Sequence, residues 1–297
     1  MNANTTSPPV SLAIVTPSFN QATYVEAAMR SVLEQNHPVL SYAVMDGGST
    51  DGSVEIIKAH ADRLAAWRSA PDGGQYAAVA AGFELTSGEV MGWLNSDDMY
   101  CPWALSVVGE VFGRFPEIEW LTTTRPLFWD RDGRAVHGAA VPGYAKRAFM
   151  GGEHLPRGSG SKLGYIQQES TFWRRSLWER AGGFDAAYPL AGDFALWARF
   201  FREAELYAVE TPLGGFRSHG DQKTGRAFAS YAEEAEKALT AYGGRRPGCS
   251  ERILRELALR TPARSWPIWE RAGLLHRAKV VTYDRTGAGW RIEERTI

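Results

Sequence analysis

Residues 89–98 read Glu-Val-Met-Gly-Trp-Leu-Asn-Ser-Asp-Asp, an apolar run that passes directly into a polar, acidic end. The first part, Glu89–Leu94, is typical of a short strand buried on both faces. Ser11–Thr16 and Ser41–Met45 are similar apolar runs, and a shorter strand is expected near Trp67. These runs predict a set of short strands in the core of the protein.

Stretches with apolar residues at helical spacing separate these strands. They are expected at Ala22–Gln35, from Ser53 onward and at Gln75–Leu85. The alternation predicts an α/β fold in which helices flank a mostly parallel central sheet. Ligands bind beyond the carboxyl ends of the strands in such sheets. Three polar clusters follow the strands, and we expect them along one rim: Thr16–Gln21, Asp46–Ser53 and Asn95–Asp98.

The second half of the chain is less regular. Trp120–Trp129 is expected to be extended, with a hairpin turn at Asp130–Gly133. Helices are expected at Asp193–Glu203 and Arg226–Tyr242. Gly138–Gly164 is rich in Gly and Pro, which predicts a long loop over the site. Such a loop is either a functional lid or a flexible connection.

Composition narrows the class of protein. The chain has 297 residues, 44% of them hydrophobic, and a net charge of -1, which argues against nucleic acid as the main partner. Its two cysteines, Cys101 and Cys249, argue against a thiolate zinc site or a disulfide framework. Met1–Val10 lacks the pattern of a secretory signal, and no stretch has the roughly 20 apolar residues of a membrane span. A soluble, cytoplasmic protein is expected.

The polar clusters admit chemical and structural interpretations. Asp97 and Asp98 would repel each other unless a cation or a donor lies between them, and oxygen ligands suit Mg²⁺ or Mn²⁺. The same residues could equally cap a helix before Pro102. Asp46 lies in a glycine-rich segment that could approach a base or ribose, or could simply form a turn and a cap.

Two later residues are also open to both interpretations. Asp193 follows Gly192 at the start of a predicted helix, so it is either a helix cap or a general base for a hydroxyl group. His219 lies in a polar, glycine-flanked segment and is either a metal ligand or a surface residue. By contrast, three tryptophans are expected in the core rather than under a sugar: Trp173, Trp178 and Trp197.

Taken together, the motifs resemble the inverting glycosyltransferases of family 2, which have the GT-A (Rossmann-like) fold. The resemblance covers roughly Ser11 to Gln222, in the order and at the spacings of the family. Its motifs are Thr16-Pro-Ser-Phe-Asn20, Asp46-Gly-Gly-Ser-Thr-Asp51, Pro71-Asp-Gly-Gly-Gln-Tyr76, Asn95-Ser-Asp-Asp98, Gly182-Gly-Phe-Asp185, Asp193 and His219.

The resemblance implies a role for each of these positions. The residues implied in donor binding are Thr16, Pro17, Ser18, Phe19, Asp46, Gln75, Asn95 and Asp97. Asp98 and His219 are implied as ligands of Mn²⁺ or Mg²⁺, and Asp193 as the catalytic base. Gln168 and Glu169 lie where contacts to the acceptor or the donor sugar are expected. The implied donor is a nucleotide sugar, with UDP as the first nucleotide to test, and the implied acceptor is a glycan or a lipid-linked molecule.

The resemblance also implies a division of the chain and a direct displacement with inversion. Residues 1–225 would form the catalytic domain, with a nucleotide-binding half at about 11–100 and an acceptor half at about 101–225. Residues 226–297 would form a mainly helical appendage. The sequence departs from the family pattern at Gly47, Gly192, Ala77 and Ala80, but keeps the implied metal and base positions.

Other classes fit less well. A sugar nucleotidyltransferase would need a glycine-rich basic loop after the first strand, and a dehydrogenase would need GxGxxG there. A non-catalytic sugar-nucleotide or glycan-binding protein on a degenerate transferase fold stays an alternative. From about Ser230, arginines alternate with Leu, Ile and Trp. This region is either a packed appendage with a basic face or a peripheral contact with the inner face of a membrane.

Overall fold

The computed structural model of the chain describes residues 9–156, 163–220, 223–287 and 289–297. In these residues a nine-stranded sheet has the order β13-β12-β10-β6-β9-β4-β1-β2-β3. Its strands are β1 (Leu12–Ser18), β2 (Leu40–Asp46), β3 (Ala66–Ser69), β4 (Val90–Trp93), β6 (Trp120–Thr123), β9 (Phe172–Arg174), β10 (Leu206–Val209), β12 (Arg277–Asp284) and β13 (Gly289–Thr296). Five of the pairings between neighbours are parallel, which confirms the mostly parallel sheet.

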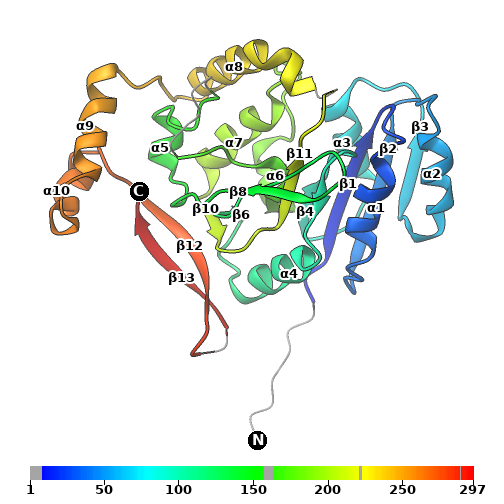
Figure 1. The fold of residues 1–297 in the computed structure, drawn as a ribbon, viewed down its shortest axis with the longest axis horizontal. Coiled ribbons are helices and arrows are strands. Elements are labelled where there is room, and N and C mark those ends of the chain that lie inside the picture. Colours follow the sequence, from blue (N-terminus) through cyan, green and yellow to red (C-terminus); the bar gives the residue numbers. More distant parts are fainter. Residues whose placement is uncertain (1–8, 157–162, 221–222, 288) are drawn as a thin grey trace, which may run out of the picture.

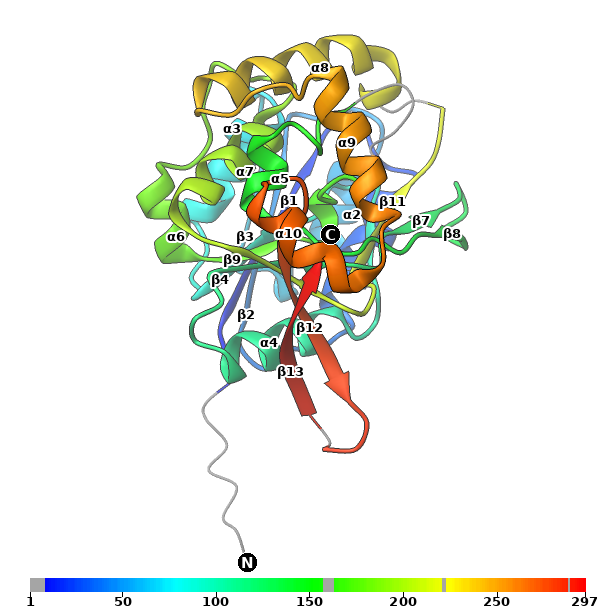
Figure 2. The same cartoon turned by 90° about the vertical axis from the view of Figure 1, so that its left-hand side faces the viewer.

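Helices cover both faces of this sheet (Figure 1). They are α1 (Val25–Leu33), α2 (Ser53–Ala59), α3 (Gln75–Glu84), α4 (Ala104–Arg114), α5 (Lys146–Met150), α6 (Arg175–Ala181), α7 (Gly192–Glu203), α8 (Lys223–Ala241), α9 (Cys249–Leu259) and α10 (Trp266–Arg271). α9 and α10 lie together at the left end of the molecule in Figure 1, and Figure 2, viewed from that end, shows them in front with α8 above them. A smaller sheet has the order β5-β11-β7-β8 in the described residues. Its strands are β5 (Met99–Tyr100), β7 (Leu127–Trp129), β8 (Ala135–Gly138) and β11 (Gly214–Arg217).

The apolar pattern of the strands explains why the sheet is buried. All seven residues of β1 are buried, because alternate side chains face the two layers of helices. Ala13 and Val15 belong to the core cluster that includes α7, whereas Leu12 and Ile14 belong to the cluster that includes α1 and α4. The parallel register of β1 and β2 ends with Ser18 opposite Asp46. The polar clusters after these strands therefore lie side by side, as predicted.

The tryptophans expected in the core are there. Trp173 is fully buried, Trp197 is 2% exposed, and Trp178 packs against the same cluster. The rings of Trp173 and Trp197 lie 5.7 Å apart, edge to face. Their burial confirms the prediction that they are core residues rather than platforms for a sugar.

The segment Gly138–Gly164 differs from the expected long loop. Residues 157–162 lie outside the described residues, but the earlier part contains α5 and buried side chains. Phe149 of α5 stacks on Phe194, with 4.8 Å between ring centroids, and also contacts Phe201. These aromatic contacts hold the segment against α7, so its described part is packed structure rather than a free lid.

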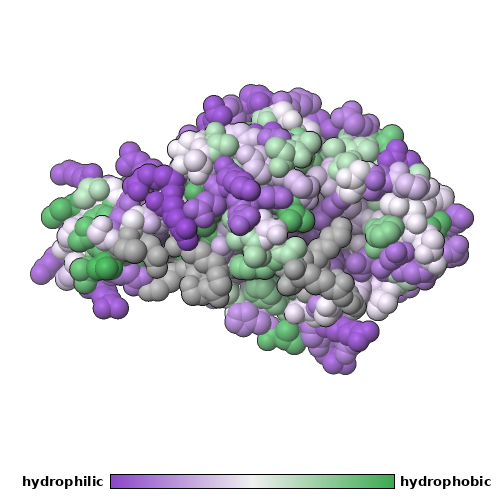
Figure 3. Space-filling model, turned by 90° about the horizontal axis from the view of Figure 1, so that it is seen from above, coloured by the Kyte–Doolittle hydropathy of each residue, from purple (hydrophilic) through white to green (hydrophobic). Residues whose placement is uncertain are grey.

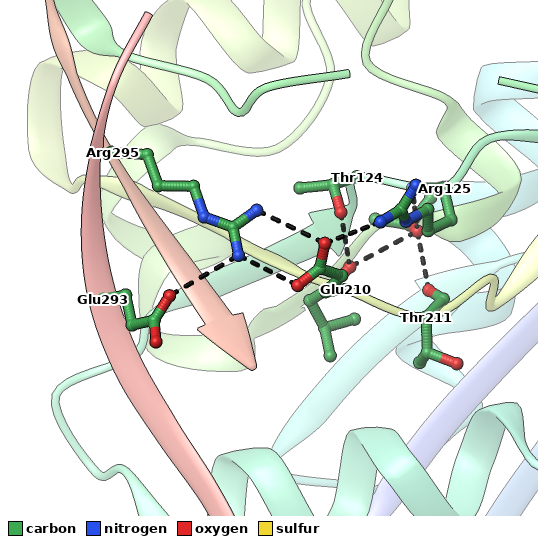
Figure 4. Close-up of polar contacts among 8 residues, drawn as sticks. Thr124, Arg125, Glu210, Thr211, Glu293 and Arg295 are labelled. Atoms are coloured by element: carbon green, nitrogen blue, oxygen red, sulfur yellow. Dashed lines mark hydrogen bonds and ion pairs between the residues drawn. The ribbon is translucent and has the colours of Figure 1, made fainter. Parts of the chain in front are cut away.

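The C-terminal region also contains more than helices. After α8, α9 and α10, the β12–β13 hairpin joins the edge of the central sheet through a parallel pairing of β12 with β10. Val280 and Val281 of β12 are fully buried against the sheet. Figure 4 shows how Glu210 lies between Arg295 of β13 and Arg125, with N–O distances of 2.9 and 2.6 Å. Apolar burial and this shared carboxylate explain why the hairpin extends the sheet.

The described part of the chain has no helix with the length and hydropathy of a membrane span.

Candidate active site

The carboxyl ends of β1 and β2 form the first part of the site. The Asp46 carboxylate is 2% exposed and organises the turn that follows it. Its Oδ2 accepts bonds from the backbone N–H groups of Gly48 and Ser49, at 3.0 and 2.9 Å, and from the Ser69 hydroxyl at 2.7 Å. Its Oδ1 accepts from the Ser49 hydroxyl. Because a carboxylate oxygen has two lone pairs, Oδ1 has an acceptor position to spare.

The segment from Thr16 to Phe19 lines the same end of the sheet. Thr16 is fully buried, and its hydroxyl accepts a hydrogen bond from Tyr42 at 2.8 Å. Pro17 and Ser18 are also buried, and the Ser18 hydroxyl has no partner among the described residues. Phe19 is 56% exposed, an unusual position for a phenylalanine. The segment thus has the exposed ring of Phe19 next in the chain to Ser18, whose hydroxyl has hydrogen-bonding capacity that no described residue uses.

An amide relay joins three of the predicted residues. The Gln75 side chain donates to Asn95 Oδ1 at 2.7 Å. Asn95 in turn lies 3.1 Å from Gln168 Oε1 and 3.2 Å from Asp98 Oδ2. Gln168 is anchored by a 2.6 Å bond to the carbonyl of Trp93, at the end of β4. The relay therefore connects the start of α3 and the end of β4 with the Gln168–Ser170 turn.

Carboxylates gather at the end of β4. Asp98 is 1% exposed and Glu169 is 4% exposed. Burial, together with the charges of Asp97 and Glu169, raises the pKa of Asp98 well above its ordinary value. Burial also raises the pKa of Glu169 to about 7, with further increases from Asp193 and Asp97. His219 is 3.0 Å from Asp97 Oδ2, and the Asp98 Oδ1 atom accepts from the backbone N–H of Arg217 at 2.8 Å.

These groups fit a divalent cation in part. No group of three or more His, Cys, Asp or Glu side chains is placed to hold a metal ion within the described ranges. His219 lies against Asp97 rather than Asp98, so the two implied metal ligands are not shown together. However, Mg²⁺ and similar ions are commonly held by one or two carboxylates plus substrate phosphates, not by a complete protein cage. Buried carboxylates with raised pKa values, and a Glu169 Oε1 atom without a partner among the described residues, match that donor set.

Asp193 lies in the first turn of α7, between two tyrosines. The Tyr231 hydroxyl is 3.2 Å from both carboxylate oxygens, and the Tyr76 hydroxyl is 3.3 Å from Oδ1. The backbone N–H of Phe194 donates to Oδ1 at 2.8 Å. Burial raises the pKa of Asp193, and these hydrogen bonds oppose that increase. A desolvated carboxylate with a raised pKa can act as a general base.

The Tyr76 ring also explains why Gly192 departs from the family pattern. A Cβ atom on Gly192 would lie 2.7 Å from Cε2 of the Tyr76 ring, which is closer than real contacts allow. No larger residue fits before Asp193 unless Tyr76 moves. A Cβ on Gly47 would likewise lie 3.2 Å from Phe19 and 3.3 Å from the Asp72 carboxylate. The Tyr76 ring therefore occupies the space that a larger residue would need at position 192, whereas at position 47 the exposed Phe19 and Asp72 side chains would have to shift by a few tenths of an ångström.

The structure brings most of the predicted residues to one end of the sheet, and it adds others. The charges of Asp97 and Asp193 both raise the pKa of Glu169, so the carboxylates that follow β4 and the carboxylate at the start of α7 lie near one another. Sequence reasoning did not identify Tyr76 and Tyr231 as partners of Asp193. Tyr76 ends a motif that was recognised, so it could have been found, whereas Tyr231 lies 38 residues after Asp193 without a motif.

A cavity of about 310 Å³ lies away from these carboxylates, between α5 and the C-terminal helices. Its lining includes Arg245 and Arg255, which pair with Glu251 and Glu153 respectively. His276 contacts the same Glu153 at 3.2 Å. These ion pairs belong to the packing of the C-terminal region, and none of the proposed site residues within the described ranges lines the cavity.

Comparisons with known proteins agree with the geometry. Residues 13–125 match the family model for glycosyl transferase family 2. A relative from Mycobacterium tuberculosis, described as an uncharacterized glycosyltransferase, is 28% identical over 194 residues, which cover 64% of this chain and 67% of the relative. An uncharacterized glycosyltransferase from Nostoc is 33% identical over 110 residues, or 34% of this chain and 32% of that protein.

Solved structures show the same architecture. S. aureus TarS 1-349 in complex with UDP-GlcNAc has a TM-score of 0.59 at 14% identity, covering 88% of this chain and 79% of that one. The mannosyltransferase PcManGT from Pyrobaculum calidifontis, in complex with GDP-Man and Mn²⁺, has a TM-score of 0.51 at 15% identity, with coverages of 90% and 85%. At these identities the likeness shows the fold, which is GT-A.

Proposed function

We propose a reaction for this chain, which is a glycosyltransferase of family 2 with the GT-A fold. The proposed reaction transfers a sugar from a UDP-sugar to an acceptor hydroxyl, with inversion at the anomeric carbon and dependence on a divalent metal. The observation that carries it is the burial of Asp98, Glu169 and Asp193, which raises the pKa of each carboxyl group, with a further increase at Asp98 from the charge of Glu169 and at Glu169 from the charge of Asp193. Buried negative charges so close together destabilise the folded protein unless a bound cation or proton neutralises them.

The donor is proposed to lie across the ends of β1, β2 and β4. The base would pack near the exposed ring of Phe19, and its N–H would use the remaining acceptor position on Asp46 Oδ1. The Gln75–Asn95–Gln168 relay supplies amide groups for the ribose or the sugar. Asp97 is proposed to face the ribose or the sugar, beside His219.

Asp98 is the proposed protein ligand of Mn²⁺ or Mg²⁺, with His219 as a further ligand from the loop after β11. When bound, the ion would neutralise charge on the leaving nucleoside diphosphate. Asn95 orients the Asp98 carboxylate through its side-chain amide at 3.2 Å, and the backbone of Arg217 fixes the other oxygen.

Asp193 is the proposed catalytic base. As the acceptor oxygen forms its bond to the anomeric carbon, the bond from that carbon to the diphosphate oxygen breaks, and the hydroxyl proton passes to Asp193. One displacement from the opposite face inverts the carbon, without a covalent intermediate. The raised pKa of Asp193 brings its proton affinity closer to that needed for this transfer.

The donor proposal is tested by calorimetric titration with UDP, with and without Mn²⁺, on wild type and Asp98→Ala. We expect metal-dependent binding in the wild type and its loss in the variant. Asp132→Ala is the control, because this carboxylate is 62% exposed on another turn and should leave binding unchanged. Binding of GDP or dTDP instead of UDP would revise the donor. If no nucleoside diphosphate binds, the chain is better explained as a non-catalytic glycan-binding protein.

For the acceptor, we propose a glycan or lipid-linked molecule reached at the inner face of a membrane. Ile253 and Leu257, one turn apart on α9, are 61% and 53% exposed, and Ile268 of α10 is 65% exposed. Arg260 and Arg264 lie exposed between them in the chain. Figure 3 shows hydrophobic and hydrophilic groups mixed at the left end of the molecule, where α9 and α10 lie in Figure 1. Apolar side chains among cations suit an anionic lipid surface.

Sedimentation with phosphatidylglycerol vesicles tests this contact. We expect the wild type to pellet with anionic vesicles and Leu257→Glu to stay in the supernatant. Val136→Glu is the matched control, because Val136 is 60% exposed on β8, away from the helices. No binding of the wild type to anionic vesicles would contradict the membrane proposal and leave the donor proposal intact.

A further inference from the structure

Two side chains of α8 reach the start of α7. Tyr231 contacts both oxygens of Asp193 at 3.2 Å. Three residues later, Glu234 Oε2 accepts hydrogen bonds from the backbone N–H groups of Leu190 and Ala191, at 2.8 and 2.9 Å. Residues three apart lie on the same face of a helix, so one face of α8 makes both contacts.

The start of α7 needs these contacts. Ala191, which precedes the helix, has no side chain that caps it. The first N–H groups of a helix lack partners within the helix, and they carry partial positive charge. Glu234 satisfies the two N–H groups just before Gly192 with a carboxylate from another helix. The position of the first turn of α7 therefore depends on α8.

Asp193 depends on α8 in a second way. The Tyr76 hydroxyl lies 2.9 Å from the carbonyl of Leu190 and 3.3 Å from Asp193, and its single proton can serve only one of them at a time. Tyr231 has no competing acceptor among the contacts that the structure describes, and it reaches both carboxylate oxygens. Burial raises the pKa of Tyr231 well above its ordinary value, so it stays a proton donor. Glu169 is the other ionisable side chain coupled to Asp193.

We propose that Tyr231 and Glu234 are positioning residues for the base Asp193, so that α8 of the C-terminal region completes the active site. Glu234 fixes the backbone before Asp193, and Tyr231 fixes the orientation of its carboxylate. During transfer the acceptor proton moves to Asp193, and Tyr231 keeps its own proton as a hydrogen-bond donor. The inference rests on the proposed role of Asp193 as the base.

The first test is spectroscopic and needs no substrate. The protein is labelled with aspartate that carries ¹³C in its side-chain carboxyl group, and the resonance that disappears in Asp193→Asn identifies Asp193. Its pKa is then measured in wild type, Tyr231→Phe and Tyr242→Phe. Loss of a donor to the carboxylate should raise the pKa of Asp193 by about 1 pH unit in Tyr231→Phe. Tyr242→Phe is the control, because its hydroxyl donates to Asp185 at 2.6 Å and does not contact Asp193.

The second test is kinetic. Release of UDP from UDP-sugars, with water as the acceptor, is measured for Tyr231→Phe and Glu234→Gln. We expect kcat to fall about 10- to 100-fold with the KM of the donor unchanged, since α8 touches the base and not the donor site. Glu236→Gln is the matched control, because Glu236, two residues after Glu234, is 43% exposed and pairs with Arg246.

An Asp193 pKa that is the same in wild type and Tyr231→Phe would overturn the inference. An equal loss of kcat in Glu236→Gln would overturn it as well, since it would indicate a general loss of stability. If the wild type releases UDP from no donor, the proposed function fails. The spectroscopic result still decides whether Tyr231 holds Asp193.

Discussion

Glu169→Gln should make the metal-free protein more stable at high pH. Burial raises the pKa of Glu169 from its ordinary 4.5 to about 7, so the folded protein holds a proton that the unfolded chain releases between these values. Its contribution to stability is therefore full below pH 4.5 and is lost as the pH rises to about 7. At about 1.4 kcal/mol for each pH unit, the wild type loses about 3 kcal/mol across this window. The side-chain amide that the substitution introduces does not ionise, so the unfolding free energy of the variant does not decrease in this way as the pH rises.

The assay is urea unfolding of both proteins in EDTA at pH 5, 6, 7 and 8. The difference in unfolding free energy between variant and wild type should grow toward about 3 kcal/mol by pH 8, because contributions from other groups cancel. UDP with Mn²⁺ should reduce the gap by stabilising the wild type. A difference that stays constant with pH, or that falls as the pH rises, would show that the pKa of Glu169 is not raised into this range and would refute the reasoning.

Three further changes test other parts of the structure. Asp193→Asn should lower sugar transfer about 10²- to 10⁴-fold while calorimetry shows unchanged UDP binding; undiminished transfer would exclude Asp193 as the base. Gly192→Ala would place a Cβ 2.7 Å from the Tyr76 ring, so urea unfolding should show a loss of about 1–3 kcal/mol, and an unchanged midpoint would contradict this packing. Arg295→Ala should lower the free energy of unfolding by less than about 1 kcal/mol, because Glu210 keeps its ion pair with Arg125 at 2.6 Å; a larger loss would show that Glu210 needs both arginines.

The fold could be predicted where the apolar pattern is long or the strand runs into a polar cluster. β1, β2, β3 and β4 lie within two residues of the runs that predict them. β9 could not be found this way, because its three residues are too few to show a period, and it lies between β4 and β6 through antiparallel pairing. The β12–β13 hairpin follows three helices, and the sequence of residues 226–297 predicts a mainly helical region without locating these two strands.

Some residues of the candidate site could also be predicted from the sequence, and others could not. Asp98 and Asp193 stand in recognisable motifs, and the structure places both at the carboxyl end of the sheet. The role of Tyr231 and Glu234 depends on where α8 docks, which is decided by tertiary packing and not by local sequence. The sequence likewise does not explain why a glycine precedes Asp193, because the reason is the Tyr76 ring, which packs against Gly192 in the folded protein.

The pairing of β12 with β10 has a consequence for protein synthesis. Tyr207 lies opposite Lys279, so about 70 residues must follow β10 before its parallel neighbour exists. At about 5–20 residues per second, the ribosome needs about 4 to 14 s to make them. During that interval the outer edge of β10 has unpaired N–H and C=O groups, which favour pairing with other chains. Until residues 277–284 have been made, this edge of the nascent protein is therefore open to pairing with other chains.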